Sequence, residues 1–147
     1  MTGRETSTPG TQAECDLAAP TSGKMRVALD IDDTITRHPI FFSFLSNALV
    51  DSGHEVYIIS YREGQEDVET DLAADGISFT EVVLPTPDAL DRDGFYGWKA
   101  ATCRRLGVEV FFEDMPEVVN ELDTDVLAFV PYDADLGGLR YVDQPET

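Results

Sequence analysis

The sequence predicts an α/β fold in which a five-stranded parallel sheet lies between two layers of helices. Two observations support this prediction. Five short apolar runs alternate along the chain with segments of helical periodicity. Polar or acidic residues follow directly after three of these runs. Because a strand–helix–strand alternation favours parallel strands joined by right-handed crossovers, these polar residues are expected at one edge of the sheet.

The first strand and the first helix are predicted at residues 26–29 and 39–52. Residues 26–29 form a largely apolar run that suits a strand buried on both faces, and Asp30 follows it. In residues 39–52 the apolar residues recur at helical spacing. Pro39 suits the first turn of a helix and Gly53 suits its end.

Residues 55–60 are the second predicted strand. This run is apolar and ends in the hydroxyl residue Ser60. A helix is predicted over residues 65–74, where two apolar residues lie at helical spacing, and we expect it to stop at Gly76. Residues 77–84 are predicted to form the third strand. The order strand, helix, strand is thus repeated, as a parallel sheet requires.

The second half of the chain continues the alternation after a predicted loop. Residues 85–94 contain two prolines and three aspartates and are expected to form a surface loop. A helix is predicted over residues 96–106, closed by Gly107, and a fourth strand over residues 108–112. The last predicted elements are a short helix and a strand, at residues 116–122 and 125–130.

The charge of the chain limits its partners. The formal net charge is -19 at pH 7, with 29 acidic residues against 10 lysines and arginines. A surface this acidic repels nucleic-acid polymers, and no local basic patch overcomes the repulsion, so nucleic acid is not an expected partner. The composition is similar to that of proteins from salt-loving organisms, and whether the source is halophilic stays open. Only two lysines occur, Lys24 and Lys99, which draws attention to the one inside the predicted fold.

One folded unit is expected, flanked by polar segments. Residues 1–24 are rich in Thr, Ser, Gly and Pro and are expected to be a disordered leader. The folded domain is expected over residues 25–131 and an acidic tail over residues 132–147. No run is apolar enough to cross a bilayer or to act as a signal peptide, so no membrane partner is expected and a cytoplasmic location is the default. The cysteines, Cys15 and Cys103, are far apart and indicate neither a disulfide framework nor a zinc site.

Polar side chains that suit metal and phosphate chemistry are expected to meet at the carboxyl edge of the sheet. They follow strand ends or lie near the start of a helix: Asp30, Asp32, Asp33, Ser60, Arg62, Lys99, Glu113 and Asp114. Asp30 and Asp32 are two positions apart, so both can approach one divalent cation. A calcium loop that begins at Asp30 is a competing interpretation. It fails because an EF-hand needs glycine where Ile35 stands and glutamate where Phe41 stands.

Four motifs in this order resemble those of the haloacid dehalogenase-like (HAD) superfamily of phosphatases and phosphotransferases. The first is an apolar strand followed by Asp30-Ile31-Asp32-Asp33-Thr34, and the second is a strand that ends in Ser60. The third is Lys99 near the start of a helix, and the fourth is a strand followed by Glu113-Asp114. The resemblance covers residues 24–130 and implies a three-layer, Rossmann-like (HAD-like) catalytic domain. The Glu-Asp pair departs from the commoner Asp-Asp, which leaves open whether Glu113 would bind a metal directly or through water.

The resemblance implies a Mg²⁺-dependent phosphatase that works through an aspartyl-phosphate intermediate. Asp30 would be the nucleophile, and Asp32 would be the general acid and base. Ser60 and Lys99 would contact the phosphoryl group. The implied metal ligands are Asp30, Asp32 (through its backbone carbonyl), Glu113 and Asp114. We expect five gathered carboxylates, including Asp33, to repel one another and to take up protons in the absence of Mg²⁺, so that Mg²⁺ stabilises the fold.

Three further residues near the motifs are candidates for contact with the substrate. They are Thr34, Arg62 and His38. His38 and the Phe41-Phe42 pair follow the first motif and could line an entrance, although core aromatic residues and a histidine at a helix start are the simpler interpretation. A charged residue after a strand, such as Arg62, is commonly only exposed, and Asp33 is expected to stabilise its loop.

The intervals between the motifs leave little or no room for a cap domain. The first interval accommodates one helix, and the second holds only elements that the sheet itself needs. We therefore expect an open site that accepts a small phosphorylated metabolite or nucleotide, with a second subunit of a homo-oligomer supplying the lid. Two other functions stay open: phosphotransfer to an acceptor other than water, and a non-catalytic module that binds metal or phosphate.

Overall fold

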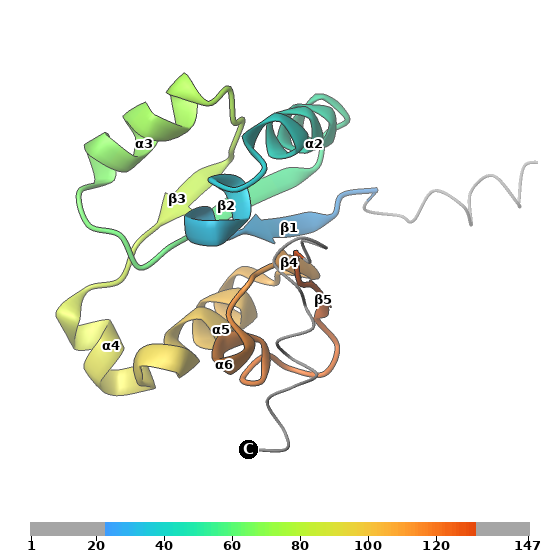
Figure 1. Cartoon of the computed structure of the whole chain (residues 1–147). Helices are drawn as coiled ribbons and strands as arrows, with labels where there is room; N and C mark the ends of the chain where they lie inside the picture. Colours follow the sequence, from blue (N-terminus) through green and yellow to red (C-terminus); the bar gives the residue numbers. More distant parts are fainter. Residues whose placement is uncertain (1–22, 132–147) are drawn as a thin grey trace, which may run out of the picture.

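Five parallel strands lie at the centre of the structure, a computed structural model that describes residues 23–131 (Figure 1). The strands are β1 (Arg26–Leu29), β2 (Glu55–Ile59), β3 (Glu81–Val83), β4 (Val110–Phe112) and β5 (Leu127–Phe129). Their order in the sheet is β3-β2-β1-β4-β5, and every neighbouring pair is parallel. The predicted tail at 132–147 and nearly all of the predicted leader at 1–24 lie outside the described residues.

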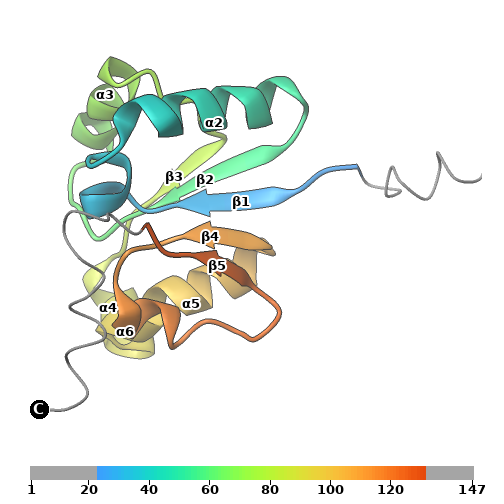
Figure 2. The ribbon, with the colours of Figure 1, turned by 45° about the vertical axis from the view of Figure 1, so that its right-hand side comes forward.

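Helices cover both faces of the sheet (Figure 2). The helices are α2 (Pro39–Asp51), α3 (Gln65–Ala74), α4 (Pro87–Asp93), α5 (Phe95–Leu106) and α6 (Pro116–Val119). Helices α2 and α3 lie on one face, and α4, α5 and α6 lie on the other. This arrangement confirms the predicted α/β fold with five parallel strands between two helix layers.

The two faces of the central strands supply two separate hydrophobic cores. Leu29 and Ile58 pack with Phe42 on the side of α2 and α3. Ala28 packs with Trp98 on the side of α4, α5 and α6. Because successive side chains of a strand point to opposite faces, a strand covered by helices on both sides must be apolar throughout. This requirement explains why the first two strands could be predicted from their composition.

Cys103 of α5 belongs to the second of these cores and is 1% exposed. Burial raises the pKa of its thiol from 9.0 to about 12, so the thiol stays protonated at neutral pH. It is a free cysteine. Cys15 lies outside the described residues.

The predicted third strand is too long. Residues 77–80 are not part of β3. The Ser78 N–H donates to the Ser46 hydroxyl oxygen at 3.1 Å, and Ile77 completes the end of α3. The Ile77 N–H donates to the Leu72 carbonyl oxygen at 3.0 Å, and Gly76 has a φ of 73°. This left-handed conformation is typical of a residue that ends a helix. Strands β2, β4 and β5 and helix α6 are likewise shorter than their predicted ranges.

The predicted loop at residues 85–94 contains helix α4, so that prediction is wrong. Thr86 caps the helix, since its hydroxyl oxygen accepts a hydrogen bond from the Ala89 N–H at 3.1 Å. Pro87 occupies the first turn, where a missing N–H costs nothing. The prolines that indicated a loop are therefore part of a helix start. Helix α5 follows at once, from Phe95.

The connection between β1 and β2 contains a single wide turn, η1 (Ile31–Ile35), and helix α2. This agrees with the prediction that one helix fills the interval. Across residues 23–131, none of the helices combines the length and the apolar character that crossing a membrane would require.

Candidate functional site

The carboxyl ends of β1 and β4 bring Asp30 and Glu113 together. Leu29 is paired with Phe112 in the register of these strands, and the Asp30 N–H donates to the Phe112 carbonyl oxygen at 3.0 Å. The chain leaves β1 toward the helix layer of α2 and leaves β4 toward the layer of α6. Ligands of open α/β sheets bind at such positions, because the diverging connections leave a crevice between them.

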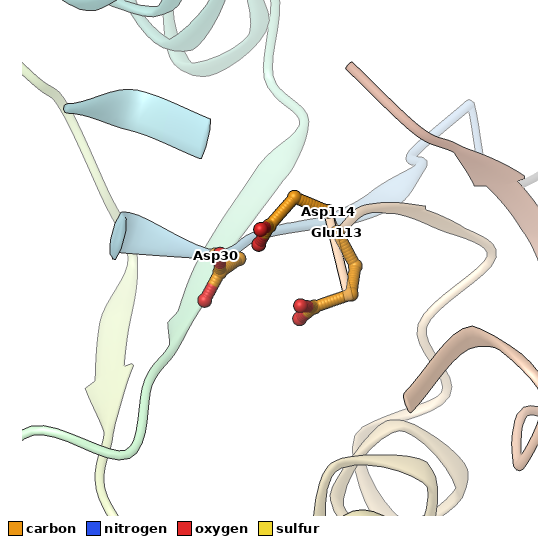
Figure 3. Close-up of side chains that lie close together, drawn as sticks. All are labelled: Asp30, Glu113 and Asp114. Carbon is orange, nitrogen blue, oxygen red and sulfur yellow. The ribbon is translucent and has the colours of Figure 1, made fainter. Parts of the chain in front are cut away.

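Asp30, Glu113 and Asp114 form a cluster of carboxylates at this edge (Figure 3). One oxygen atom from each residue lies within 4.8 Å of the others. Asp30 and Glu113 are buried, whereas Asp114 is half-buried. Carboxylate oxygens suit Mg²⁺, which usually keeps several water ligands and so needs few from the protein. The donor set therefore fits the expected cation.

Lys99 joins two of these carboxylates. Its Nζ lies 2.7 Å from Asp30 Oδ1 and 2.8 Å from Glu113 Oε1. Helix α5 carries the lysine, and only 1% of its side chain is exposed. The Nζ also lies 4.7 Å from the centre of the Tyr61 ring, in a cation–π contact. Because a buried ammonium needs a charged partner, the lysine and the two carboxylates depend on one another.

Two further hydrogen bonds orient the same carboxylates. The Thr34 hydroxyl donates to Asp30 Oδ2 at 2.9 Å, and the Met115 N–H donates to Glu113 Oε2 at 3.1 Å. Both oxygens of each carboxylate are therefore engaged. Thr34 is completely buried, so the structure places it as a positioning residue for Asp30 rather than on an open surface.

All three clustered carboxyl groups have raised pKa values. Burial raises the pKa of Asp30 from 3.8 to about 6, although Lys99 acts in the opposite direction. Burial is also the largest cause of the raised pKa values of Glu113 and Asp114. The expectation that these carboxyl groups take up protons without a cation is thus supported. The larger cause is loss of hydration rather than mutual repulsion.

Of the five carboxylates that were predicted to gather, three form the cluster, whereas the side chains of Asp32 and Asp33 pair with arginines. The charge of Asp33 still contributes to the raised pKa of Asp114. Arg62 donates to Asp32 through Nη2 at 2.7 Å and through Nε at 3.1 Å. Arg37 lies 3.4 Å from Asp33, which has a φ of 65° in the turn η1. The Asp32 side chain is 62% exposed and is not one of the clustered ligands. Arg62, a predicted substrate contact, is engaged with Asp32.

Ser60 and His38 have different surroundings. Ser60 directly follows β2, beside β1, and is 1% exposed. Its oxygen accepts from the Arg62 N–H at 3.1 Å, and its own hydrogen can still be donated. His38 precedes α2 and, together with Phe41 and Phe129, lines an apolar cleft of about 230 Å³. The structure therefore groups Ser60 with the strand ends and His38 with this cleft.

Comparison of the chain with protein-family models, curated proteins and solved structures found no match. A function is therefore argued from the residues themselves. At the carboxyl edge of the sheet, a buried lysine joins two carboxylates and a third carboxylate lies beside them. A buried hydroxyl residue ends the neighbouring strand. Together these groups can hold a cation, attack an electrophile and donate hydrogen bonds to an anion.

Tyr61 is a residue of the site that the motifs did not single out. Its ring contacts Lys99 and stacks on Phe95, with the ring centres 4.1 Å apart and the planes 13° apart. Its hydroxyl donates to the Phe95 carbonyl oxygen, and burial raises its pKa. Its position directly after Ser60, at the end of a predicted strand, was the feature of the sequence that could have indicated a place in the site. Met115 contributes only a backbone N–H, which no side-chain pattern could indicate.

Proposed function

We propose that the chain is a HAD-like, Mg²⁺-dependent phosphatase that hydrolyses phosphate monoesters. The observation that supports this most directly is the buried Lys99 held between Asp30 and Glu113, with Asp114 in the same cluster. A carboxylate fixed on both oxygens is suitably oriented for attack on one substrate atom. The third and fourth motifs of the resemblance therefore meet the first motif at one edge of the sheet.

In the proposed reaction, Asp30 attacks the phosphorus atom of the substrate. A bond forms between a carboxylate oxygen and phosphorus while the bond from phosphorus to the leaving oxygen breaks. Water then attacks the same phosphorus atom, which releases inorganic phosphate and restores the Asp30 carboxylate. Asp30, Glu113 and Asp114 would hold a Mg²⁺ ion, which would supply charge neutralisation for the phosphoryl group.

Lys99 and Ser60 act on the charge that develops during this reaction. The Lys99 ammonium is within hydrogen-bond distance of Asp30 and offsets negative charge close to the nucleophile. The Ser60 hydroxyl has a hydrogen available for a phosphoryl oxygen. Because both side chains are buried, their positions are set before substrate binds.

Asp32 transfers the protons in this proposal. It protonates the leaving oxygen in the first step and takes a proton from water in the second. Arg62 holds both oxygens of the exposed Asp32 carboxylate away from the cluster, so this role requires Asp32 to leave Arg62 and turn toward Asp30 when substrate binds.

The substrate in this proposal is a small phosphorylated metabolite or nucleotide. Between β1 and β2 the chain has only a turn and one helix, so no inserted domain encloses the site from that side. A second subunit of a homo-oligomer is proposed to supply the lid. The net charge of -19 disfavours a nucleic-acid polymer as substrate.

The deciding experiment is hydrolysis of p-nitrophenyl phosphate with and without Mg²⁺. Asp30→Asn should lower kcat by about a thousandfold or more, because an amide does not form the acyl phosphate. Asp33→Asn is the matched control and should retain activity, since Asp33 pairs with Arg37 outside the cluster. Activity of Asp30→Asn close to that of the unmodified chain would refute the nucleophile.

Phosphotransfer shares the first half of this reaction and differs only in the acceptor. The exposure of Asp32 favours phosphotransfer as a second candidate function, because an acceptor alcohol could reach the Asp32 carboxylate as readily as water does. Product analysis with added alcohols separates the two functions. A phosphorylated alcohol that increases with alcohol concentration indicates transfer, and inorganic phosphate alone indicates hydrolysis.

A further inference from the structure

A second cleft lies between helices α4 and α5, which Figure 1 shows side by side. Its volume is about 390 Å³, within the range of roughly 300–1,000 Å³ typical of small-molecule sites. The lining is mixed: Leu84, Ala89 and Trp98 are among its apolar residues, and its charged residues are Arg92, Asp93 and Arg105. None of the residues assigned to the phosphatase reaction lines it.

Arg105 is unusual among the cations of the described chain. Within residues 23–131, it is the one lysine or arginine for which the structure records no ion pair. Every other cation in this range lies 2.7 to 3.5 Å from a carboxylate oxygen. Asp93, the carboxylate that lines the cleft, pairs with Arg92 instead, so the Arg105 guanidinium is available to a ligand.

The charge at the cleft favours a monoanion. Arg92 is already bound to its neighbour Asp93 through Nε at 3.2 Å and Nη2 at 3.0 Å, which leaves Arg105 as the uncompensated positive charge. One guanidinium matches one carboxylate in charge and in its planar, two-pronged geometry. A phosphate dianion would carry excess negative charge toward an already acidic protein.

We propose that this cleft binds a small carboxylic acid with an apolar body. Arg105 binds the carboxylate, and Trp98, Ala89 and Ala101 contact the apolar part. This site is separate from the proposed phosphatase site, and the proposal does not depend on phosphatase activity. The ligand belongs to the class of aryl or short alkyl carboxylates, because a cleft of about 390 Å³ lined by two small alanines leaves room for a ring or a short chain.

The test uses Trp98 as a built-in reporter, since it is the single tryptophan of the chain. Phenylacetate is titrated into the full chain while Trp98 fluorescence is recorded, and calorimetry measures the same binding independently. Phenylacetamide, which has the same shape without the charge, should bind at least about tenfold more weakly. A saturable response to phenylacetate is the expected result.

Two adjacent arginines provide the matched variants. Arg105→Gln should weaken phenylacetate binding by about tenfold or more, because it removes a charge-assisted hydrogen bond. Arg104→Gln should leave the affinity unchanged, since Arg104 pairs with Asp123 at 2.9 Å. Both arginines are exposed, so thermal melts should show both variants folded.

Three outcomes would overturn the proposal. The first is no saturable binding of phenylacetate by either method. The second is equal affinity for phenylacetate and phenylacetamide. The third is an equal effect of Arg105→Gln and Arg104→Gln, which would mean that phenylacetate binds elsewhere or responds only to total charge.

Discussion

Lys99 is the residue on which the candidate site depends most. It contributes one positive charge to a buried region that holds Asp30 and Glu113. Bringing such charges out of water costs several kcal/mol per ion, by order of magnitude, and their mutual attraction offsets that cost only while the geometry is kept. Removal of one partner is therefore far more damaging than the net contribution of the pair would suggest.

Replacement of Lys99 by methionine should destabilise the chain strongly. We expect the free energy of unfolding at neutral pH to fall by about 3–5 kcal/mol, because two buried carboxylates lose their cation. Urea unfolding followed by circular dichroism measures this change. Lys24→Met is the control, since Lys24 pairs with Glu55 at 3.5 Å on the surface and should change stability by less than about 1 kcal/mol. Equal effects of the two variants would contradict the buried ion-pair network.

The pKa of Asp30 gives the metal-free chain a defined pH dependence. In the folded chain the pKa is raised from 3.8 to about 6, so between these values the folded state binds more protons than the unfolded state. The stabilising contribution of Asp30 is therefore complete below about pH 4. It is lost as the pH rises through about 6.

Mg²⁺ should reverse this dependence, because it binds the ionised carboxylates. The increase in Tm caused by millimolar Mg²⁺ is expected to be small near pH 4 and to grow as the pH passes 6. Thermal melts at several pH values, with Mg²⁺ or with a chelator, measure the effect. The Asp30→Asn variant should lose most of the increase, and a Tm that ignores Mg²⁺ at every pH would count against the cation site.

At the scale of helices and strands, the alternation of elements could be predicted, but their ends could not. The buried strands are apolar on both faces, which is visible in the sequence. The limit of β3 depends instead on Ile77, whose N–H closes helix α3 rather than joining the sheet. This local bond uses a residue of the apolar run predicted to start the strand, and apolar composition alone does not distinguish the two uses.

The positions of site residues that directly follow a strand could be predicted from the sequence. Asp30 and Glu113 follow adjacent strands, so the topology alone places them together. The direction of the Asp32 side chain was not predictable, because it is determined by Arg62, which is distant in sequence. The partners of a side chain, rather than its spacing along a strand, decide whether it faces the cluster.

Helix α4 allows a direct test of the capping interaction at Thr86. Thr86→Ala should lower the free energy of unfolding by about 1 kcal/mol, because the Ala89 N–H loses its acceptor. Thr86→Ser keeps a hydroxyl oxygen and should stay close to the unmodified chain. Denaturant unfolding of both variants measures the difference. Equal stability of the alanine and serine variants would mean that the cap does not hold this helix.

At the scale of the whole molecule, self-repulsion should limit stability. With a net charge of -19, the compact chain gathers negative charge that salt can screen. The Tm is therefore expected to rise as potassium chloride is added. Thermal melts at increasing concentrations of potassium chloride, without sulfate, measure this screening. Sulfate is left out because it also strengthens the burial of apolar groups. A Tm that falls over the series would show that specific ion pairs outweigh the repulsion.

The reactivity of the buried Cys103 thiol can be used to measure local unfolding around α5. Its high pKa and its 1% exposure leave it inert to alkylating reagents while the layer of α5 stays packed. Lys99 lies one helical turn earlier on α5, so an opening that exposes the thiol also disturbs the lysine. In a Cys15→Ser background, the rate of thiol alkylation would thus report how often the native chain transiently dismantles its candidate site.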